Sequence, residues 1–128
     1  MAVDPIPHAD KQAFLEAIAM RAVLDNNRLR ARAANRLEQS KKEALRLARA
    51  LSELDGIQKV IHFGSSASGR NFRLDSDIDL AIVGGDILDA VRVVESSSFR
   101  VDIIDIETVP SPLRDAVIGQ GDVLYEKR

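Results

Sequence analysis

The first part of the chain has the composition and spacing of helix. Residues 9–54 are rich in Ala, Leu, Arg, Glu and Lys and contain no Gly or Pro, and Gly56 follows as a natural helix end. Apolar residues recur there every three or four positions, which predicts two helices with a break at Asn26 and Asn27 or near Gln39 and Ser40. The apolar stripe of the first helix is narrow and includes small residues, a pattern that favours packing against another helix.

The second part alternates short apolar runs with shorter helical segments. Asp86 is a suitable N-cap for a helix that continues to about Glu95, and Pro112 opens a short helix that ends near Gly119. The runs typical of strands cover residues 57–63, 77–83, 99–106 and 122–126. Strands that alternate with helices predict an α/β fold in which helices pack on a sheet.

Composition limits the classes of protein that the chain can belong to. With 128 residues it forms one domain, and 18 Lys and Arg against 20 Asp and Glu give a net charge of −2, which argues against a general nucleic-acid coat. Residues 1–56 carry 10 basic and 8 acidic side chains, whereas residues 57–128 carry 8 and 12. The absence of cysteine excludes disulfides and thiolate metal sites and suits a reducing compartment.

Targeting signals are not evident in the sequence. The N-terminus lacks the basic stretch and continuous apolar segment of a signal peptide. No run approaches the roughly 18 apolar residues of a membrane-spanning helix. We therefore expect a cytoplasmic protein without a membrane partner.

Two aspartates interrupt an apolar strand. Asp77 and Asp79 are two residues apart, so on a strand they share one face while Ile78 and Leu80 occupy the other. Two carboxylates this close repel each other unless a cation lies between them, and Mg²⁺ prefers such oxygen ligands. Asp102 supplies a third ligand if its strand lies beside theirs. Taken alone, the pair is explained equally well as a turn followed by a solvated strand end.

A glycine and serine turn precedes the aspartates. Gly64 and Ser65 end an apolar run and begin a short polar segment, an arrangement that exposes backbone N–H groups to a phosphate. The spacing from Gly64 to Asn71 is similar to that of a P-loop. However, Arg70 and Asn71 stand where that loop needs Lys and then Ser or Thr, so the P-loop is excluded.

In combination these motifs resemble the minimal nucleotidyltransferases of the DNA polymerase β superfamily. The resemblance rests on Gly64-Ser65, on Asp77-Ile78-Asp79 and on Asp102 within "RVDII", and it extends over residues 40–125. It implies the polymerase β-like nucleotidyltransferase fold, an α/β (α+β) structure with a mixed β-sheet packed by helices. The spacer, residues 66–76, is one residue longer than is usual in that family, and the helix over residues 9–37 has no counterpart in its minimal unit.

The resemblance also implies a chemistry. The Gly64 amide and the Ser65 hydroxyl would hold the β- and γ-phosphates of ATP or another nucleoside triphosphate. Asp77 and Asp79 would carry two Mg²⁺ ions, and Asp102 would hold the ion that activates an attacking hydroxyl. A nucleoside monophosphate, AMP in the case of ATP, would then move to that hydroxyl with release of pyrophosphate.

Several further polar residues have weaker indications. Arg70 and Arg73 belong to the loop expected over the triphosphate and are candidates for phosphate contacts. Asp105 is three residues from Asp102 and faces the other way on a regular strand, so we expect it to be structural. His62, at a strand end, is expected to be a half-buried histidine with a hydrogen-bond partner rather than a base. Arg28, Arg32 and Arg36 share one helical face, which favours a solvated role.

The acceptor of the nucleotide is expected to be another protein. Residues 103–128 are too few to build an acceptor domain. Standalone minimal proteins that this chain resembles are often encoded with a HEPN-domain toxin, and the resemblance therefore implies an antitoxin that transfers AMP to a tyrosine of that toxin. We therefore expect residues 40–128 to form the minimal nucleotidyltransferase domain and residues 1–39 to form a helical extension for docking or for homo-oligomerisation. Nucleic acid is not an expected partner.

Two other functions fit the same sequence. The chain is alternatively a non-catalytic binding module that masks its partner, although three intact aspartates argue against loss of activity. It is also compatible with a small-molecule nucleotidyltransferase of the antibiotic-modifying kind, which the lack of an acceptor domain weakens.

Overall fold

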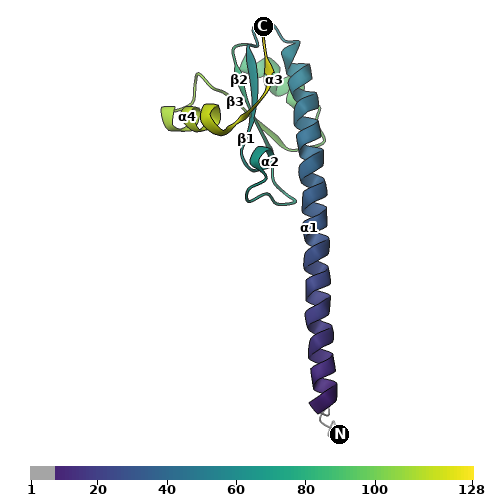
Figure 1. Cartoon of the computed structure of the whole chain (residues 1–128). Coiled ribbons are helices and arrows are strands. Elements are labelled where there is room, and N and C mark those ends of the chain that lie inside the picture. The colour runs from purple at the N-terminus through teal and green to yellow at the C-terminus, as the bar shows by residue number, and fades with distance from the viewer. Residues whose placement is uncertain (1–7) are drawn as a thin grey trace, which may run out of the picture.

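The computed structural model describes residues 8–128. Within this described part of the chain, four helices and four strands follow one another in the order α1-β1-α2-β2-α3-β3-α4-β4 (Figure 1). The helices are α1 (His8–Ser52), α2 (Ser65–Ser68), α3 (Ile87–Val94) and α4 (Ser111–Gln120). The strands are β1 (Lys59–Phe63), β2 (Ile78–Val83), β3 (Val101–Asp105) and β4 (Asp122–Glu126). The strands and short helices lie close to their predicted positions.

One continuous helix replaces the two that the sequence predicts at the N-terminus. Helix α1 runs through Asn26, Asn27 and Gln39 without a break, so the predicted interruption is wrong. Asparagine lowers helix propensity by only a fraction of a kcal/mol, and with no Gly or Pro between His8 and Ser52 nothing forces an end. The Ser40 hydroxyl is buried and donates to the Arg36 carbonyl oxygen at 2.9 Å, which satisfies it within the helix.

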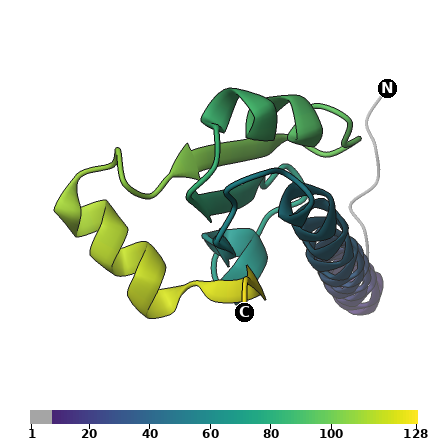
Figure 2. The same cartoon turned by 90° about the horizontal axis from the view of Figure 1, so that it is seen from above.

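The four strands form one mixed sheet in the order β3-β2-β1-β4. Strand β1 is antiparallel to both β2 and β4, whereas β2 and β3 are parallel and joined through α3. Seen from above, α1 and α3 lie on one side of the sheet and α4 on the other (Figure 2). This arrangement confirms the predicted mixed sheet packed by helices with an additional N-terminal helix.

The alternation of side chains along β2 divides the core into two parts. Ile78, Leu80 and Ile82 are fully buried against α1 and α3, in a cluster that includes Leu47 and Leu51 of α1. The other face carries a smaller cluster, which joins α4 to the sheet and consists of Ile61, Ala81, Ile106 and Val117. Asp79 alternates onto this second face, at the end of the sheet where β2 begins.

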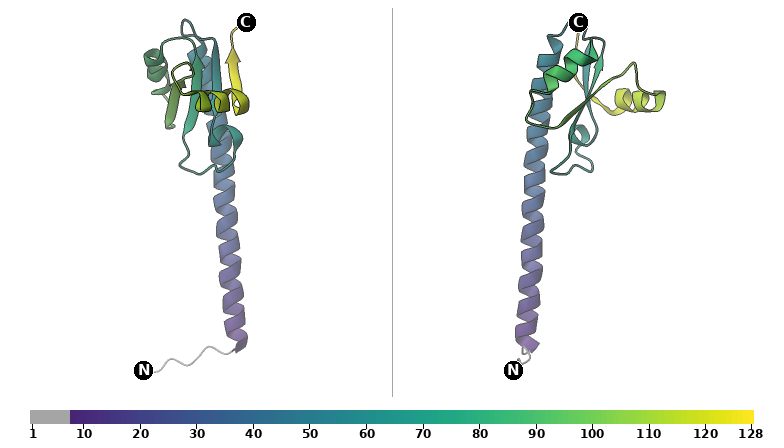
Figure 3. Two further views of the ribbon diagram at one scale, coloured as in Figure 1. Left: turned by 90° about the vertical axis from the view of Figure 1, so that its left-hand side faces the viewer. Right: turned by 180° about the vertical axis from the view of Figure 1, so that it is seen from behind.

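Only the C-terminal part of α1 belongs to the domain. The rest of the helix extends beyond the sheet, past the α2 end of the domain (Figures 1 and 3). Arg36 lies where the domain begins, with its guanidinium 3.8 Å from the centroid of the Phe99 ring. The expectation of a solvated arginine face is therefore wrong for Arg36, because the neighbouring Phe99 supplies a cation–π partner.

Candidate active site

The aspartates meet where β2 and β3 begin. Asp79 and Asp102 are register partners on these adjacent parallel strands, so both side chains point to the face covered by α4. Asp77 stands immediately before β2, with the same alternation as Asp79. Asp105 pairs instead with Ile82, on the opposite face, and its carboxylate accepts a hydrogen bond from the Glu107 amide at 3.0 Å.

The electrostatics of Asp79 reflect this crowding. Burial, followed by the neighbouring charges of Asp102 and Asp77, raises the pKa of the Asp79 carboxyl from 3.8 to about 6. A carboxyl with a raised pKa is costly to ionise in place, and a nearby cation relieves that cost. The three carboxylates thus have the oxygen chemistry that a hard divalent ion requires. Within residues 8–128, however, no three acidic or histidine side chains are gathered tightly enough to form a metal centre.

Gly64 forms the turn that lies against Asp79. Its backbone has φ of 77° and ψ of −165°, a conformation that favours glycine, and a Cβ at this position would overlap the Asp79 carboxylate. The Gly64 carbonyl oxygen accepts from the Ala67 and Ser68 amides at 3.2 and 3.1 Å, which closes the single turn of α2. Ser65 opens this turn and is partly exposed. The predicted glycine and serine turn therefore lies directly beside one of the predicted aspartates.

The two loop arginines remain apart from the aspartates. Arg70 and Arg73 lie between α2 and β2, and both side chains are exposed. Their backbone amides are held by serine hydroxyls, Arg70 by Ser68 at 3.1 Å and Arg73 by Ser76 at 2.8 Å. The ion pairs among residues 8–128 do not include either arginine.

A different arginine lies next to the site. The Nε of Arg100 is 3.9 Å from a carboxylate oxygen of Asp77, and the Arg100 carbonyl oxygen accepts from the Ile78 amide at 2.9 Å. Sequence reasoning missed Arg100, because its position depends on the register between β2 and β3. Its place one residue before the strand that carries Asp102 was the only available indication.

A buried pair fixes α2 to the sheet. The Nε2 of His62 is 2.7 Å from the Ser66 hydroxyl, and both residues are buried. Burial, opposed by Asp122 and assisted by Lys41, lowers the pKa of His62 from 6.5 to about 4, so the imidazole is neutral at pH 7. This confirms a histidine with a hydrogen-bond partner, although it is fully rather than half buried. A four-residue helix has little stability of its own, so this contact holds the turn next to Gly64 in place.

Removal of the Ser66 hydroxyl tests this anchor. Ser66→Ala leaves the His62 ring nitrogen buried without a partner, and we expect the free energy of unfolding to fall by about 1–3 kcal/mol. Chemical denaturation at pH 7 measures the loss. Ser65→Ala, the adjacent change on the exposed side of the turn, is the control and should leave stability unchanged. Equal stability of both variants would contradict the anchoring role.

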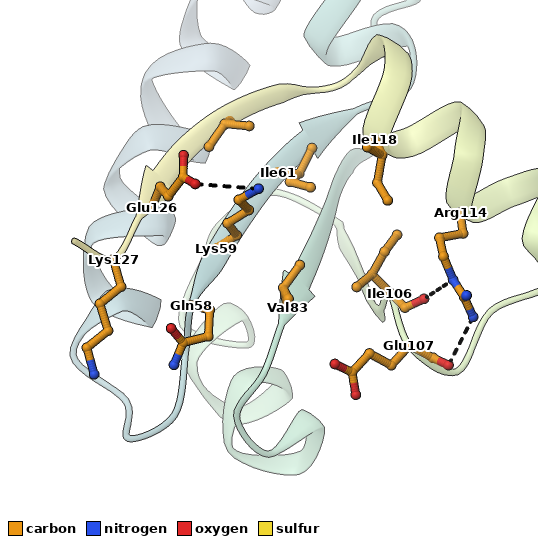
Figure 4. Close-up of a pocket in the computed structure, with 11 residues that line it drawn as sticks. Gln58, Lys59, Ile61, Val83, Ile106, Glu107, Arg114, Ile118, Glu126 and Lys127 are labelled. Atoms are coloured by element: carbon orange, nitrogen blue, oxygen red, sulfur yellow. Dashed lines mark hydrogen bonds and ion pairs between the residues drawn. The ribbon is translucent and has the colours of Figure 1, made fainter.

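Two hollows lie on the α4 face of the sheet. The smaller, of about 250 Å³, opens beside Gly64 between α2 and α4 and is also lined by Ala67 and Val117. The larger, of about 480 Å³, lies at the opposite end of the strands (Figure 4). There the Arg114 guanidinium donates to the Ile106 and Glu107 carbonyl oxygens at 3.1 and 3.3 Å, which ties α4 to the end of β3. Gly64 therefore lies between the smaller hollow and the Asp79 carboxylate.

Comparison with known families agrees with this geometry. Residues 46–128 match the model of the family described as polymerase beta, nucleotidyltransferase, so the chain belongs to the polymerase β nucleotidyltransferase family. No curated protein matches the chain in sequence. None of the helices in residues 8–128 combines the length and the apolarity that a membrane span requires.

Solved structures with the same fold include chains of toxin–antitoxin complexes. One, from a toxin–antitoxin crystal structure with AMP-PNP, is 24% identical, with 71% of this chain and 74% of the other aligned at a TM-score of 0.50. Another, from a variant of the MntA–HpeT toxin–antitoxin, is 22% identical over 69% and 73% of the two chains at a TM-score of 0.51. At these identities the likeness establishes the fold.

Proposed function

We propose that the chain transfers AMP from ATP to a hydroxyl of a partner protein, and that it acts as an antitoxin toward a HEPN-domain toxin. The observation that carries the proposal is the register pairing of Asp79 and Asp102 beside the Gly64 turn. The family supports nucleotide transfer. The neighbours support the role, because the fold recurs in toxin–antitoxin complexes, one of them solved with the ATP analogue AMP-PNP.

Each site residue has a defined part in this proposal. The Gly64 amide and the Ser65 hydroxyl bind the β- and γ-phosphates, next to the hollow between α2 and α4. Asp77, Asp79 and Asp102 would hold two Mg²⁺ ions, which supply charge neutralisation on the phosphates and a lowered pKa for the attacking hydroxyl when bound. The arrangement of the three carboxylates on one edge orients the acceptor hydroxyl for in-line displacement at the α-phosphorus, with pyrophosphate as the leaving group.

The surrounding residues refine the site. Arg70 and Arg73, exposed on the loop after α2, are proposed to contact the triphosphate when it is bound. We propose that residues 40–128 are the catalytic domain and that residues 1–39 are a helical extension to it. In support of this boundary, Ser40 is the first fully buried residue along the described part of α1.

Transfer of label tests this function directly. The purified chain, Mg²⁺, ATP labelled at the α-phosphate and a candidate HEPN toxin should give a labelled toxin. Asp102→Asn should reduce labelling at least ~10²-fold, as expected for the loss of one key electrostatic group. Asp105→Asn is the matched control, since Asp105 is on the same strand but faces the other way, and it should leave labelling unchanged.

Other outcomes identify the alternative functions. If Asp102→Asn still neutralises the toxin without labelling it, the chain acts by masking its partner. If label appears on an aminoglycoside and not on the protein, the chain is a small-molecule nucleotidyltransferase. Equal labelling by the Asp102 and Asp105 variants would contradict the proposed site.

A further inference from the structure

The projecting part of α1 exposes an apolar surface that the domain does not cover. Every side chain from Asp10 to Arg32 is exposed. The large apolar residues of this segment, 48–64% exposed, are Phe14, Leu15, Ile18, Met20, Val23, Leu24 and Leu29. A helix with so many exposed apolar side chains is marginal in water by itself, and a patch of this kind marks an interaction surface.

One side of this segment continues the stripe that packs against the sheet. The side of α1 that faces the domain is fully buried, at Ser40, Ala44, Leu47 and Leu51. At 100° per residue, the same side of the helix passes through Leu15, Ile18, Ala22, Leu29 and Ala33. From Asp10 to Arg32, the side of α1 that continues the sheet-facing stripe is therefore exposed to solvent. This part of the helix projects beyond the domain (Figure 3).

We propose that a second copy of the chain covers this side, with the two α1 helices antiparallel and a two-fold axis near Ala22. A parallel, in-register pair on this side is excluded, because the second helix would run into the sheet that covers α1 above Ala33. An antiparallel helix leads away from the sheet. The exposed segment, from Asp10 to Arg32, has its midpoint at Arg21, so pairing about the adjacent Ala22 uses nearly its whole length, about 35 Å, without a clash.

The side chains near the axis suit this pairing. Ala22 meets Ala22 at the axis, where small side chains allow the helices to approach closely, and Leu15 of one copy lies opposite Leu29 of the other. The contact between Leu15 and Leu29 occurs twice because the interface is symmetric, whereas the Ala22 contact lies on the axis and occurs once. Desolvation of these exposed side chains provides the driving force.

The charges of α1 also favour the antiparallel arrangement. Arg28, Arg30, Arg32 and Arg36 follow Asp25 without an intervening acidic residue, whereas Asp10 and Glu16 lie near the N-terminus. About the proposed axis, the position opposite Arg21 is Val23 of the other copy. Asp25 lies two residues further along, about 3 Å away on the same flank of the interface, and is within reach of the Arg21 side chain. A parallel pair would instead place Arg30 against Arg30. The charge pattern and the length of the exposed helix thus both favour a second copy of the chain in the antiparallel orientation.

Cysteine cross-linking tests orientation in a chain that contains no cysteine of its own. We expect Ala22→Cys to form a disulfide-linked dimer under mild oxidation. Leu15→Cys and Leu29→Cys, which lie opposite each other in the proposed pair, should each remain uncross-linked alone and should cross-link to each other when the two proteins are mixed. Cross-linking of Leu15→Cys with itself would indicate a parallel pair and overturn the proposal.

Sedimentation of the full chain without nucleotide tests the surface independently of catalysis. The wild type should have twice the mass of one chain. Leu15→Asp with Ile18→Asp should yield a folded monomer, whereas Leu24→Asp, on the opposite side of the same helix, should remain a dimer. Circular dichroism checks that the variants stay folded. A monomeric wild type, including one whose helix binds only a different protein, overturns the proposal.

Discussion

Asp79→Asn is expected to abolish nucleotide transfer and at the same time to stabilise the metal-free protein at neutral pH. The asparagine keeps the shape of the side chain and removes its charge. Transfer to the toxin should fall at least ~10²-fold, because one of the paired carboxylates on β2 and β3 is lost. The gain in stability follows from the raised pKa of Asp79, since ionisation of a partly buried carboxyl, next to the charges of Asp102 and Asp77, opposes folding.

The pH dependence of this stabilisation has a defined sign. The pKa of Asp79 is about 6 in the folded protein and near 3.8 in the unfolded chain, so the folded state binds more protons between these values. The free energy of unfolding of the wild type therefore falls as pH rises through this window, by the Asp79 contribution. The Asp79→Asn variant does not undergo this decrease. The difference in free energy of unfolding between the variant and the wild type should therefore be absent below about pH 4 and reach its full value above about pH 6.

His62 also changes its protonation over this pH range, so the wild type has to be compared with the variant. The pKa of His62 is lowered to about 4, so the unfolded chain binds more protons between pH 4 and 6.5 and the His62 contribution to stability rises with pH. The two residues therefore act in opposite directions over almost the same range. The pH profile of the wild type alone reports their difference, whereas the difference between wild type and Asp79→Asn isolates Asp79.

Thermal unfolding in a chelator at pH 4, 5, 6 and 7 measures the effect. The melting temperature of Asp79→Asn should exceed that of the wild type by a few degrees at pH 7, in the range that a small domain shows for about 1 kcal/mol or less. Addition of Mg²⁺ should raise the melting temperature of the wild type and not that of the variant. If Asp79→Asn were less stable than the wild type at pH 7 in chelator, ionised Asp79 would not destabilise the folded protein as we expect.

The predictable features of this site are those encoded in short stretches of sequence. Alternation of side chains placed Asp77 and Asp79 on the opposite face from Ile78, and the Gly64 turn follows from one glycine between an apolar run and serines. The α/β order of elements follows from the same patterns. Each of these depends on residues that are neighbours in the chain.

The features that sequence did not predict depend on contacts between distant segments or on small energies. Arg100 lies beside Asp77 only because β2 and β3 pair in a particular register, and Ser66 reaches His62 only because α2 folds back on β1. The continuity of α1 through Asn26 is a question of fractions of a kcal/mol, which a propensity scale does not decide. The contact between Gly64 and Asp79 belongs to the same class.

That contact makes Gly64→Ala the substitution with the second-largest expected effect. At φ of 77° and ψ of −165°, a region that essentially only glycine occupies, an alanine costs about 1–3 kcal/mol for its backbone alone. Its Cβ would also overlap the Asp79 carboxylate, so either the turn or the aspartate must move. A displacement of this kind separates the Gly64 amide, which we propose binds phosphate, from the carboxylates, and we expect labelling of the toxin to fall about 10²-fold.

Gly119→Ala is the matched control for this change. Gly119 lies in α4, has no positive φ and has no heavy atom within 4 Å of the position that a Cβ would take. The same chemical change there should leave both transfer and the free energy of unfolding unaltered or slightly improved, because alanine favours helix. Denaturant unfolding and toxin labelling of the two variants, measured side by side, separate the general effect of an added methyl group from its effect at Gly64. If Gly64→Ala transferred AMP as well as Gly119→Ala does, the turn beside Asp79 would have no part in binding the triphosphate.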